Sequence, residues 1–115
     1  MVNYNGNIIE EDVASLSIHN RGFAYGDALF ETLKVSHQKV LFWEDHYFRL
    51  MASMRILRME IPMNFTLEFL EAEVLKLIDA KQESQQTLRV KLMVNRKQGG
   101  LYLPNSNEVS YMITS

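Results

Sequence analysis

The hydrophobic period changes twice along these 115 residues, and this pattern limits the chain to folds that combine strands with helices. Apolar and polar residues alternate from Leu29 to Phe42, which is typical of strands. Apolar residues then recur every three or four positions from Trp43 to Ile61, which indicates one stripe of a helix. The alternation returns over Leu88–Asn95, and Glu108–Thr114 closes the chain as a short strand. This order predicts an α+β two-layer domain, an antiparallel sheet with two helices.

Turn and capping residues mark the ends of these elements. Asn5-Gly6 predicts a hairpin near the start of the chain, because both residues tolerate a positive φ. The two glycines within Asn20–Asp27 predict a loop. Pro62 is expected to stop the first helix, since proline cannot continue one. A second helix should then begin from a cap at Asn64 or Thr66.

The composition excludes several classes of function. The chain has no cysteine, which removes disulfides, thiolate metal sites and a cysteine nucleophile. Its 12 basic and 14 acidic side chains are dispersed, so we expect no nucleic-acid partner. His19 and His37 have no partner at a metal-ligand spacing, and no metal site is predicted. Without a signal-peptide pattern or an apolar run of about 18 residues, we expect a cytoplasmic protein with no membrane partner.

Polar side chains fall together on one face of the predicted sheet. Phe30, Thr32 and Lys34 lie opposite the apolar face of the first long hairpin. Arg89 and Lys91 do the same on the later strand. If the two strands share a sheet, one side packs on the helices and the other carries an aromatic ring, a hydroxyl and cations. That combination suits a small anionic ligand with an apolar part, and the alternative is a face that simply meets water.

Three segments resemble the class IV pyridoxal-phosphate-dependent aminotransferases, a family that includes branched-chain and D-amino-acid aminotransferases and aminodeoxychorismate lyases. Arg21–Thr32 (RGFAYGDALFET) is similar to the family's Arg-Gly and aromatic-Gly-Asp signature. Glu44–Ser53 (EDHYFRLMAS) matches its His-x-x-Arg-Leu-x-x-Ser helix. Leu88–Arg96, followed by Gly99-Gly100-x-Tyr102, resembles the end of its small domain. The matched segments occur in the family's order and together extend over most of the chain.

The resemblance implies roles for individual residues. The arginine of the His-x-x-Arg-Leu helix binds the phosphate of pyridoxal phosphate in this family, which implies that role for Arg49. Tyr25 and Phe30 correspond to positions of the substrate side-chain pocket. Arg89 aligns with a carboxylate-binding arginine of the branched-chain enzymes, and Arg96 with the arginine that serves this purpose in the D-amino-acid enzymes. Because both arginines are present, the subfamily stays open.

The family's chemistry requires a lysine that forms a Schiff base with the cofactor, and in the family this lysine lies in a larger C-terminal domain. None of the lysines of this chain falls in the corresponding position. The resemblance therefore implies that residues 1–115 are an N-terminal domain, that the lysine-bearing domain is absent from this chain, and that the chain by itself has no catalytic residue. The end at Ser115, directly after an expected strand, also favours a truncated chain.

For the parent protein, the resemblance implies transfer of an amino group between an amino acid and a 2-oxo acid, in a homodimer. Two alternatives remain. The segment Gly99-Gly100-x-Tyr102 is also similar to the aminodeoxychorismate lyase branch. The second alternative is a non-catalytic small-ligand or interaction module that kept the small-domain fold.

Overall fold

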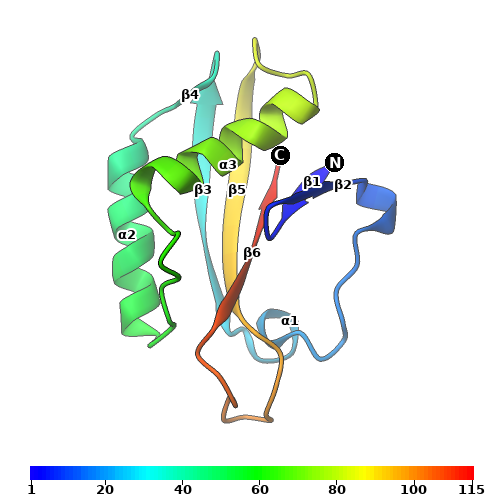
Figure 1. Ribbon diagram of the computed structural model, residues 1–115, viewed down its shortest axis with the longest axis vertical. Helices are drawn as coiled ribbons and strands as arrows, with labels where there is room; N and C mark the ends of the chain where they lie inside the picture. Colours follow the sequence, from blue (N-terminus) through cyan, green and yellow to red (C-terminus); the bar gives the residue numbers. More distant parts are fainter.

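One antiparallel sheet of six strands organises the computed structural model, which describes residues 1–115. The strand order is β2-β1-β6-β5-β3-β4. Two long helices lie on one face of the sheet, so that α3 crosses in front of β3 and β5 while α2 runs beside β3 (Figure 1). The α+β two-layer prediction is confirmed. The strands are β1 (Val2–Tyr4), β2 (Asn7–Ile9), β3 (Ala28–Ser36), β4 (Lys39–Val40), β5 (Thr87–Arg96) and β6 (Val109–Thr114), and the long helices are α2 (Trp43–Ile56) and α3 (Leu67–Ala80).

The N-terminal hairpin forms as its turn residues predict. Asn5 and Gly6 have φ values of 51° and 91°, and Tyr4 pairs with Asn7 across the turn. Both turn residues therefore occupy the left-handed region that a tight two-residue hairpin requires. Strand β1 also pairs with β6, where Tyr4 lies opposite Met112, so the two ends of the chain are neighbours in the sheet.

A buried polar contact fixes this hairpin to α3. The Asn3 amide, which is fully buried, donates to the backbone carbonyl of Glu73 at 3.1 Å and to Glu73 Oε2 at 2.7 Å. Burial, together with the charge and hydrogen bonding of Glu73, raises the pKa of Tyr111 on the adjacent β6. Because the Asn3 amide and the Glu73 carboxylate satisfy each other, these polar groups are tolerated beneath the sheet.

The first helix ends six residues before Pro62, which corrects the expected boundary. Helix α2 stops at Ile56, and Arg58 adopts a left-handed conformation with φ of 58°. The Met59 amide then donates to the Met54 carbonyl at 2.9 Å, the bond that closes a helix end of this kind. The last positions of the apolar stripe therefore lie beyond the helix, and Met59 fills the core instead.

Side-chain caps set the start of two helices. Thr66, rather than Asn64, caps α3 by accepting from the Phe69 amide at 3.0 Å. Asn20 caps a short helix, α1 (Arg21–Tyr25), by accepting from the Phe23 amide at 3.0 Å. The predicted loop in this region is therefore wrong over five residues, which are too few to display a helical period. A single 3-10 turn, η1 (Glu11–Val13), precedes it.

The hydrophobic core lies between the helices and one face of the sheet. It contains 19 buried residues, and those that are fully enclosed come from every long element. Leu33 and Val35 of β3 and Val90, Leu92 and Val94 of β5 supply the sheet side. No long helix covers the opposite face of β3 and β5. None of the helices has the length and apolar character that crossing a membrane would require.

Candidate functional site

The uncovered face of β3 and β5 carries the side chains that strand parity placed there. In the antiparallel register, Phe30 lies opposite Met93, Thr32 opposite Lys91 and Lys34 opposite Arg89, so the expected shared face is confirmed. Lys91 Nζ lies 4.3 Å from the centroid of the Phe30 ring, close enough for a cation–π interaction. A shallow depression of about 370 Å³ lies where β5 begins beside the second half of β3. It is lined by Thr32, Leu33, Lys34, Thr87, Leu88 and Arg89.

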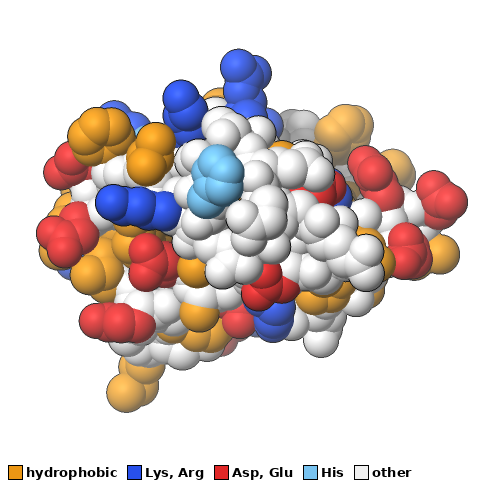
Figure 2. All heavy atoms as spheres, turned by 90° about the horizontal axis from the view of Figure 1, so that it is seen from above, with side chains coloured by type: hydrophobic (Ala, Val, Ile, Leu, Met, Phe, Trp, Pro, Cys, Tyr) orange, Lys and Arg blue, Asp and Glu red, His pale blue; other side chains and the backbone are white.

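The cations of this face have no acidic partner. Lys34, Arg89 and Lys91 take part in none of the ion pairs of the structure. Viewed from above, basic side chains project from the upper side of the molecule, whereas acidic side chains gather at its left and right ends (Figure 2). An unpaired set of cations beside an exposed aromatic ring can bind an anion that carries an apolar group.

A second polar cluster lies where α2 meets β3. Glu31 points toward the helix, and its Oε1 accepts from His46 Nδ1 and from Arg49 Nη2, both at 2.6 Å. Its Oε2 accepts from Arg49 Nε at 2.9 Å. The Glu31 residue is only 7% exposed, whereas the Arg49 side chain is 65% exposed. A buried carboxylate therefore binds one edge of the Arg49 guanidinium, and this side chain is otherwise largely exposed.

The charges of this cluster support each other. Burial alone would raise the pKa of Glu31, but the hydrogen bonds and positive charge of Arg49 and His46 outweigh it and lower that pKa. The bond to Glu31 in turn raises the pKa of Arg49. Glu31 is thus ionised, and Arg49 keeps a free Nη1 group, since its hydrogen bonds involve only Nε and Nη2. A guanidinium held in this way suits a phosphate oxygen.

A third cluster joins α1, the end of α2 and the loop between β5 and β6. Asp27 Oδ2 accepts from Arg21 Nε at 2.8 Å, and its Oδ1 lies 3.5 Å from Arg96 Nη1. Arg21 is 3% exposed and Arg96 is 6% exposed. Both guanidiniums are therefore buried, in contrast to that of Arg49.

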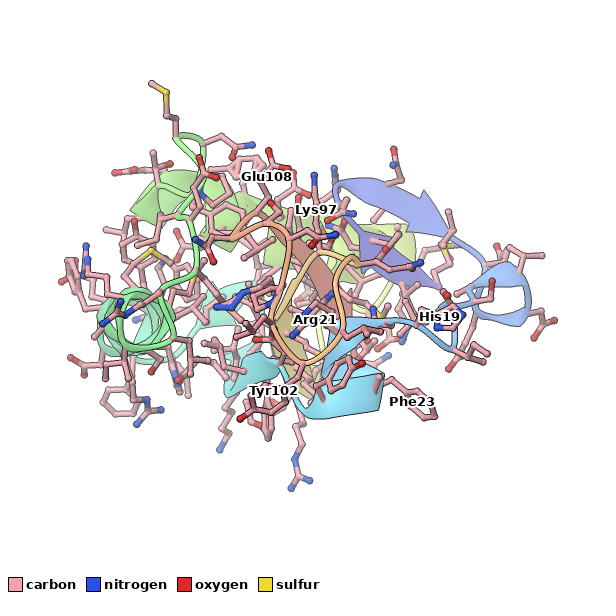
Figure 3. The ribbon with its side chains drawn as sticks, turned by 90° about the horizontal axis from the view of Figure 1, so that it is seen from below. His19, Arg21, Phe23, Lys97, Tyr102 and Glu108 are labelled. Atoms are coloured by element: carbon pink, nitrogen blue, oxygen red, sulfur yellow. The ribbon has the colours of Figure 1, made fainter.

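Terminal nitrogens of the two buried arginines also bind main-chain oxygens, whereas Arg96 Nε is buried without a hydrogen-bond partner. Arg21 donates to the carbonyls of Gly99, Leu101 and Tyr102, and Figure 3 shows it within the curve of the β5–β6 loop. Arg96 Nη2 donates to the carbonyl of Leu57, the residue that follows α2, where the negative end of the helix dipole favours a cation. These contacts connect the loop, α1 and α2 to one another.

The structure thus separates the arginines that the sequence singled out. Arg89 lies on the open sheet face opposite Lys34, and Arg96 faces the helices, because a separation of seven positions puts the two side chains on opposite faces of β5. Arg49 projects from α2 on the helix side. Tyr25 lies at the end of α1 with its ring 4.7 Å from the guanidinium carbon of Arg21.

Sequence reasoning missed two carboxylates that organise the clusters. Glu31 occupies the same strand face as Leu29, Leu33 and Val35, and this interruption of an apolar stripe is a signal that the sequence contains. Asp27 belongs to the aromatic-Gly-Asp signature, but no local pattern indicates its partners, which include a residue 69 positions away.

A protein-family model described as amino-transferase class IV matches residues 28–115. The D-alanine aminotransferase of Bacillus licheniformis is 26% identical over 100 residues, which cover 87% of this chain and 30% of that enzyme. This chain therefore spans about a third of the length of the curated relatives that it matches.

Solved structures resemble the whole chain. The branched-chain amino acid aminotransferase of Escherichia coli superposes with a TM-score of 0.83 at 16% identity, covering 98% of this chain and 38% of that one. The 4-amino-4-deoxychorismate lyase of Pseudomonas aeruginosa superposes with a TM-score of 0.77 at 28% identity, covering 100% of this chain and 39% of that one. The first likeness concerns the fold alone.

Proposed function

This chain belongs to the class IV amino-transferase family, and we propose that residues 1–115 are the N-terminal domain of a pyridoxal-phosphate-dependent aminotransferase. In this proposal the domain contributes the contact to the cofactor phosphate and one wall of the substrate pocket. The observation that carries it is the exposed guanidinium of Arg49, held on one edge by the buried Glu31.

Arg49 is the residue that we propose for the cofactor phosphate. Its free Nη1 and exposed position match the donor that a phosphate oxygen requires, and the fixed plane of a guanidinium favours a defined geometry. Another branched-chain aminotransferase structure contains N-(5'-phosphopyridoxyl)-L-glutamate, which supports a ligand of this class for the family. When bound, pyridoxal phosphate supplies the electron-withdrawing ring that amino-group transfer needs.

The open sheet face is the proposed wall for the substrate. Arg89 would bind the carboxylate of an amino acid or a 2-oxo acid, and Phe30 and Tyr25 would contact its side chain. Relatives were solved with norvaline and with 4-methylvaleric acid, an amino acid and a carboxylic acid with apolar side chains. Arg96 is the alternative carboxylate ligand, but its terminal nitrogens already bind Asp27 and Leu57 and its unpartnered Nε is buried, which favours Arg89.

The Schiff-base lysine must come from outside this chain in the proposed enzyme, from a further domain that follows in the complete protein. This chain would then bind and orient the cofactor and the substrate, while that lysine would move the proton at the reacting carbon. We expect the 115-residue chain alone to bind the cofactor weakly and to transfer no amino group.

A homodimer is the proposed assembly. Three consecutive large apolar side chains, Leu101, Tyr102 and Leu103, are each more than three-quarters exposed at the tip of the β5–β6 loop. Arg21 fixes this loop through three carbonyls, so the tip is presented in a set position. An exposed apolar tip on a fixed loop is typical of a protein–protein contact, and a second copy of the protein is the partner we propose.

Lyase chemistry is the second candidate. The 28% identity to the Pseudomonas aeruginosa 4-amino-4-deoxychorismate lyase, over 100% of this chain, favours it. The two candidates share the phosphate contact of Arg49 and differ in substrate. Assays of the complete protein with D-alanine, branched-chain L-amino acids and aminodeoxychorismate will separate them.

The test is amino-group transfer by the longest protein that the coding region specifies, with and without Arg49→Gln. We expect transfer from an amino acid to a 2-oxo acid, and at least about tenfold weaker retention of pyridoxal phosphate in the variant, the loss of about one charge-assisted hydrogen bond. Unchanged retention would remove Arg49 from this role.

The downstream coding sequence decides between an enzyme domain and a non-catalytic small-ligand module. A larger domain with a lysine after a strand is expected. A reading frame that stops after Ser115 would contradict the proposed enzyme and leave the module.

A further inference from the structure

Glu31 is a carboxylate in an apolar position. Its neighbours on the helix-facing side of β3 are Leu29, Leu33 and Val35, and the last two are almost completely buried. Desolvating a carboxylate is costly, and an apolar residue of similar volume generally stabilises a core as well as a buried ion pair does. Packing alone therefore does not account for an acid at this position.

The hydrogen bonds around Glu31 are arranged to leave part of Arg49 free. Glu31 binds the guanidinium along the edge formed by Nε and Nη2. Nη1 has no hydrogen-bond partner within the chain, and the Arg49 side chain is 65% exposed. The long side chain would otherwise sample many rotamers in water, because an exposed arginine has little else to fix it.

His46 holds the other side of the carboxylate. Its Nδ1 lies 2.6 Å from Glu31 Oε1, and since Glu31 is ionised, Nδ1 must carry the proton of this bond. The same atom lies 3.4 Å from Arg49 Nη2 and cannot accept from it while it carries that proton. His46 therefore supports Glu31 and does not compete for the donors of Arg49.

We propose that Glu31, supported by His46, is a positioning residue that fixes the Arg49 guanidinium edge-on and so presents Nη1 to the phosphate of the cofactor. This inference rests on the proposed phosphate role of Arg49 and extends it to a residue that would not touch the cofactor. Orientation, rather than charge, is the contribution of Glu31.

The direction in which one substitution changes the affinity for a phosphate distinguishes a role in orientation from a role in charge. Glu31→Gln removes a negative charge close to the proposed phosphate site, and by Coulomb's law alone this change should tighten the binding of a phosphate. If Glu31 orients Arg49, the same variant should bind the phosphate more weakly. Asp45→Asn is the matched control, because Asp45 acts on Arg49 through its charge without a hydrogen bond to it.

The experiment compares pyridoxamine 5'-phosphate with pyridoxamine, which differ in the phosphate and form no Schiff base with surface lysines. Dissociation constants are measured by NMR titration of the ¹⁵N-labelled 115-residue chain. In the unsubstituted chain the phosphate should improve affinity at least about tenfold, and Arg49→Gln should abolish this preference. Glu31→Gln should reduce the preference several-fold, and Asp45→Asn should leave it unchanged or raise it.

Two outcomes overturn the inference in different ways. A preference that Arg49→Gln abolishes but Glu31→Gln leaves intact or increases would remove Glu31 alone. Equal affinities for both ligands in the unsubstituted chain would remove the phosphate role of Arg49 and the inference with it. If Glu31→Gln does not fold, the Nε–H resonance of Arg49 in the unsubstituted chain decides: a slowly exchanging, ordered signal supports the inference, and a mobile one overturns it.

Discussion

Two arginine–carboxylate clusters of this molecule contain the same kind of ion pair but differ in which partner is more exposed. At α2, the acid Glu31 is buried and the arginine is 65% exposed. At the loop below the sheet, Asp27 is 15% exposed while Arg21 and Arg96 are almost fully buried. The buried partner in each case is the one that the fold holds in place, so the first cluster displays a guanidinium and the second encloses two.

This difference indicates which arginines of the domain are available to bind a ligand. The loop cluster contains two cations and one carboxylate, and main-chain carbonyls, including the one after α2, compensate the second charge. Arg96 Nε is buried without a partner, and both arginines are almost fully buried, so they have little accessible surface for a ligand. Arg49 retains Nη1, and Arg89 on the open face has no ion pair at all, so these two remain available.

The comparison predicts its largest effect for Asp27→Ala. Removing this carboxylate leaves Arg21 and Arg96 buried without their shared partner, and we expect a loss of about 3–5 kcal/mol in the free energy of unfolding. Urea denaturation followed by Trp43 fluorescence measures it. The exposed Asp45→Ala is the control and should stay within about 0.5 kcal/mol. A loss as small for Asp27→Ala as for Asp45→Ala would show that the loop cluster is not an enclosed one.

Arg21→Lys tests whether the shape of the guanidinium matters as well as its charge. A lysine keeps the positive charge but lacks the planar fork that reaches Asp27 and the loop carbonyls together. We expect a loss of about 1–3 kcal/mol, as one or two of these bonds are broken. Hydrogen exchange of the loop amides 97–108 should accelerate. Unchanged exchange would mean that the loop keeps its conformation without the guanidinium of Arg21.

Strand parity explains why the open face was predictable and the loop cluster was not. Alternation alone places Phe30, Thr32 and Lys34 opposite the core, and antiparallel pairing brings Arg89 next to Lys34. Parity also puts Arg96 on the other face of the strand, although the family resemblance implied the same carboxylate-binding role for Arg89 and Arg96. The burial of Arg21 depends on carbonyls 78 to 81 residues away, and no local pattern contains that information.

The first helix boundary illustrates the same limit. The apolar stripe continues to Ile61, but the chain turns at Arg58, a non-glycine residue with a positive φ. Such a conformation is set by the packing of Met59 into the core and has no compositional signal. The cap at Thr66, by contrast, was one of the two that the sequence predicted, whereas the cap at Asn20 was not predicted.

A smaller effect is expected for Asn20→Ala, which tests whether the loop cluster depends on the helix that carries it. Asn20 accepts from the Phe23 amide and so caps α1, on which Arg21 is the first residue. The loss should be about 1 kcal/mol, the usual value of such a cap, and Asn20→Ser should recover most of it. Thermal or urea unfolding measures both variants. A loss close to that of Asp27→Ala would mean that the short helix, rather than the ion pair, holds the cluster together.

The smallest expected effect is the acid dependence of the contribution of Glu31 to stability. The pKa of Glu31 is lowered from 4.5 in the folded protein by Arg49 and His46, which outweigh its burial. Glu31 therefore adds stability at pH values above 4.5, and this contribution is lost as the pH falls through the lower, folded pKa. The difference in free energy of unfolding between the unsubstituted chain and Glu31→Gln should thus shrink below about pH 4.5 and stay constant above about pH 6. Because Arg49 is largely exposed and its charge is screened, the change should be modest. A difference that grows as the solution is acidified would mean that Glu31 is protonated in the folded state, and that Arg49 is not held by an ionised partner.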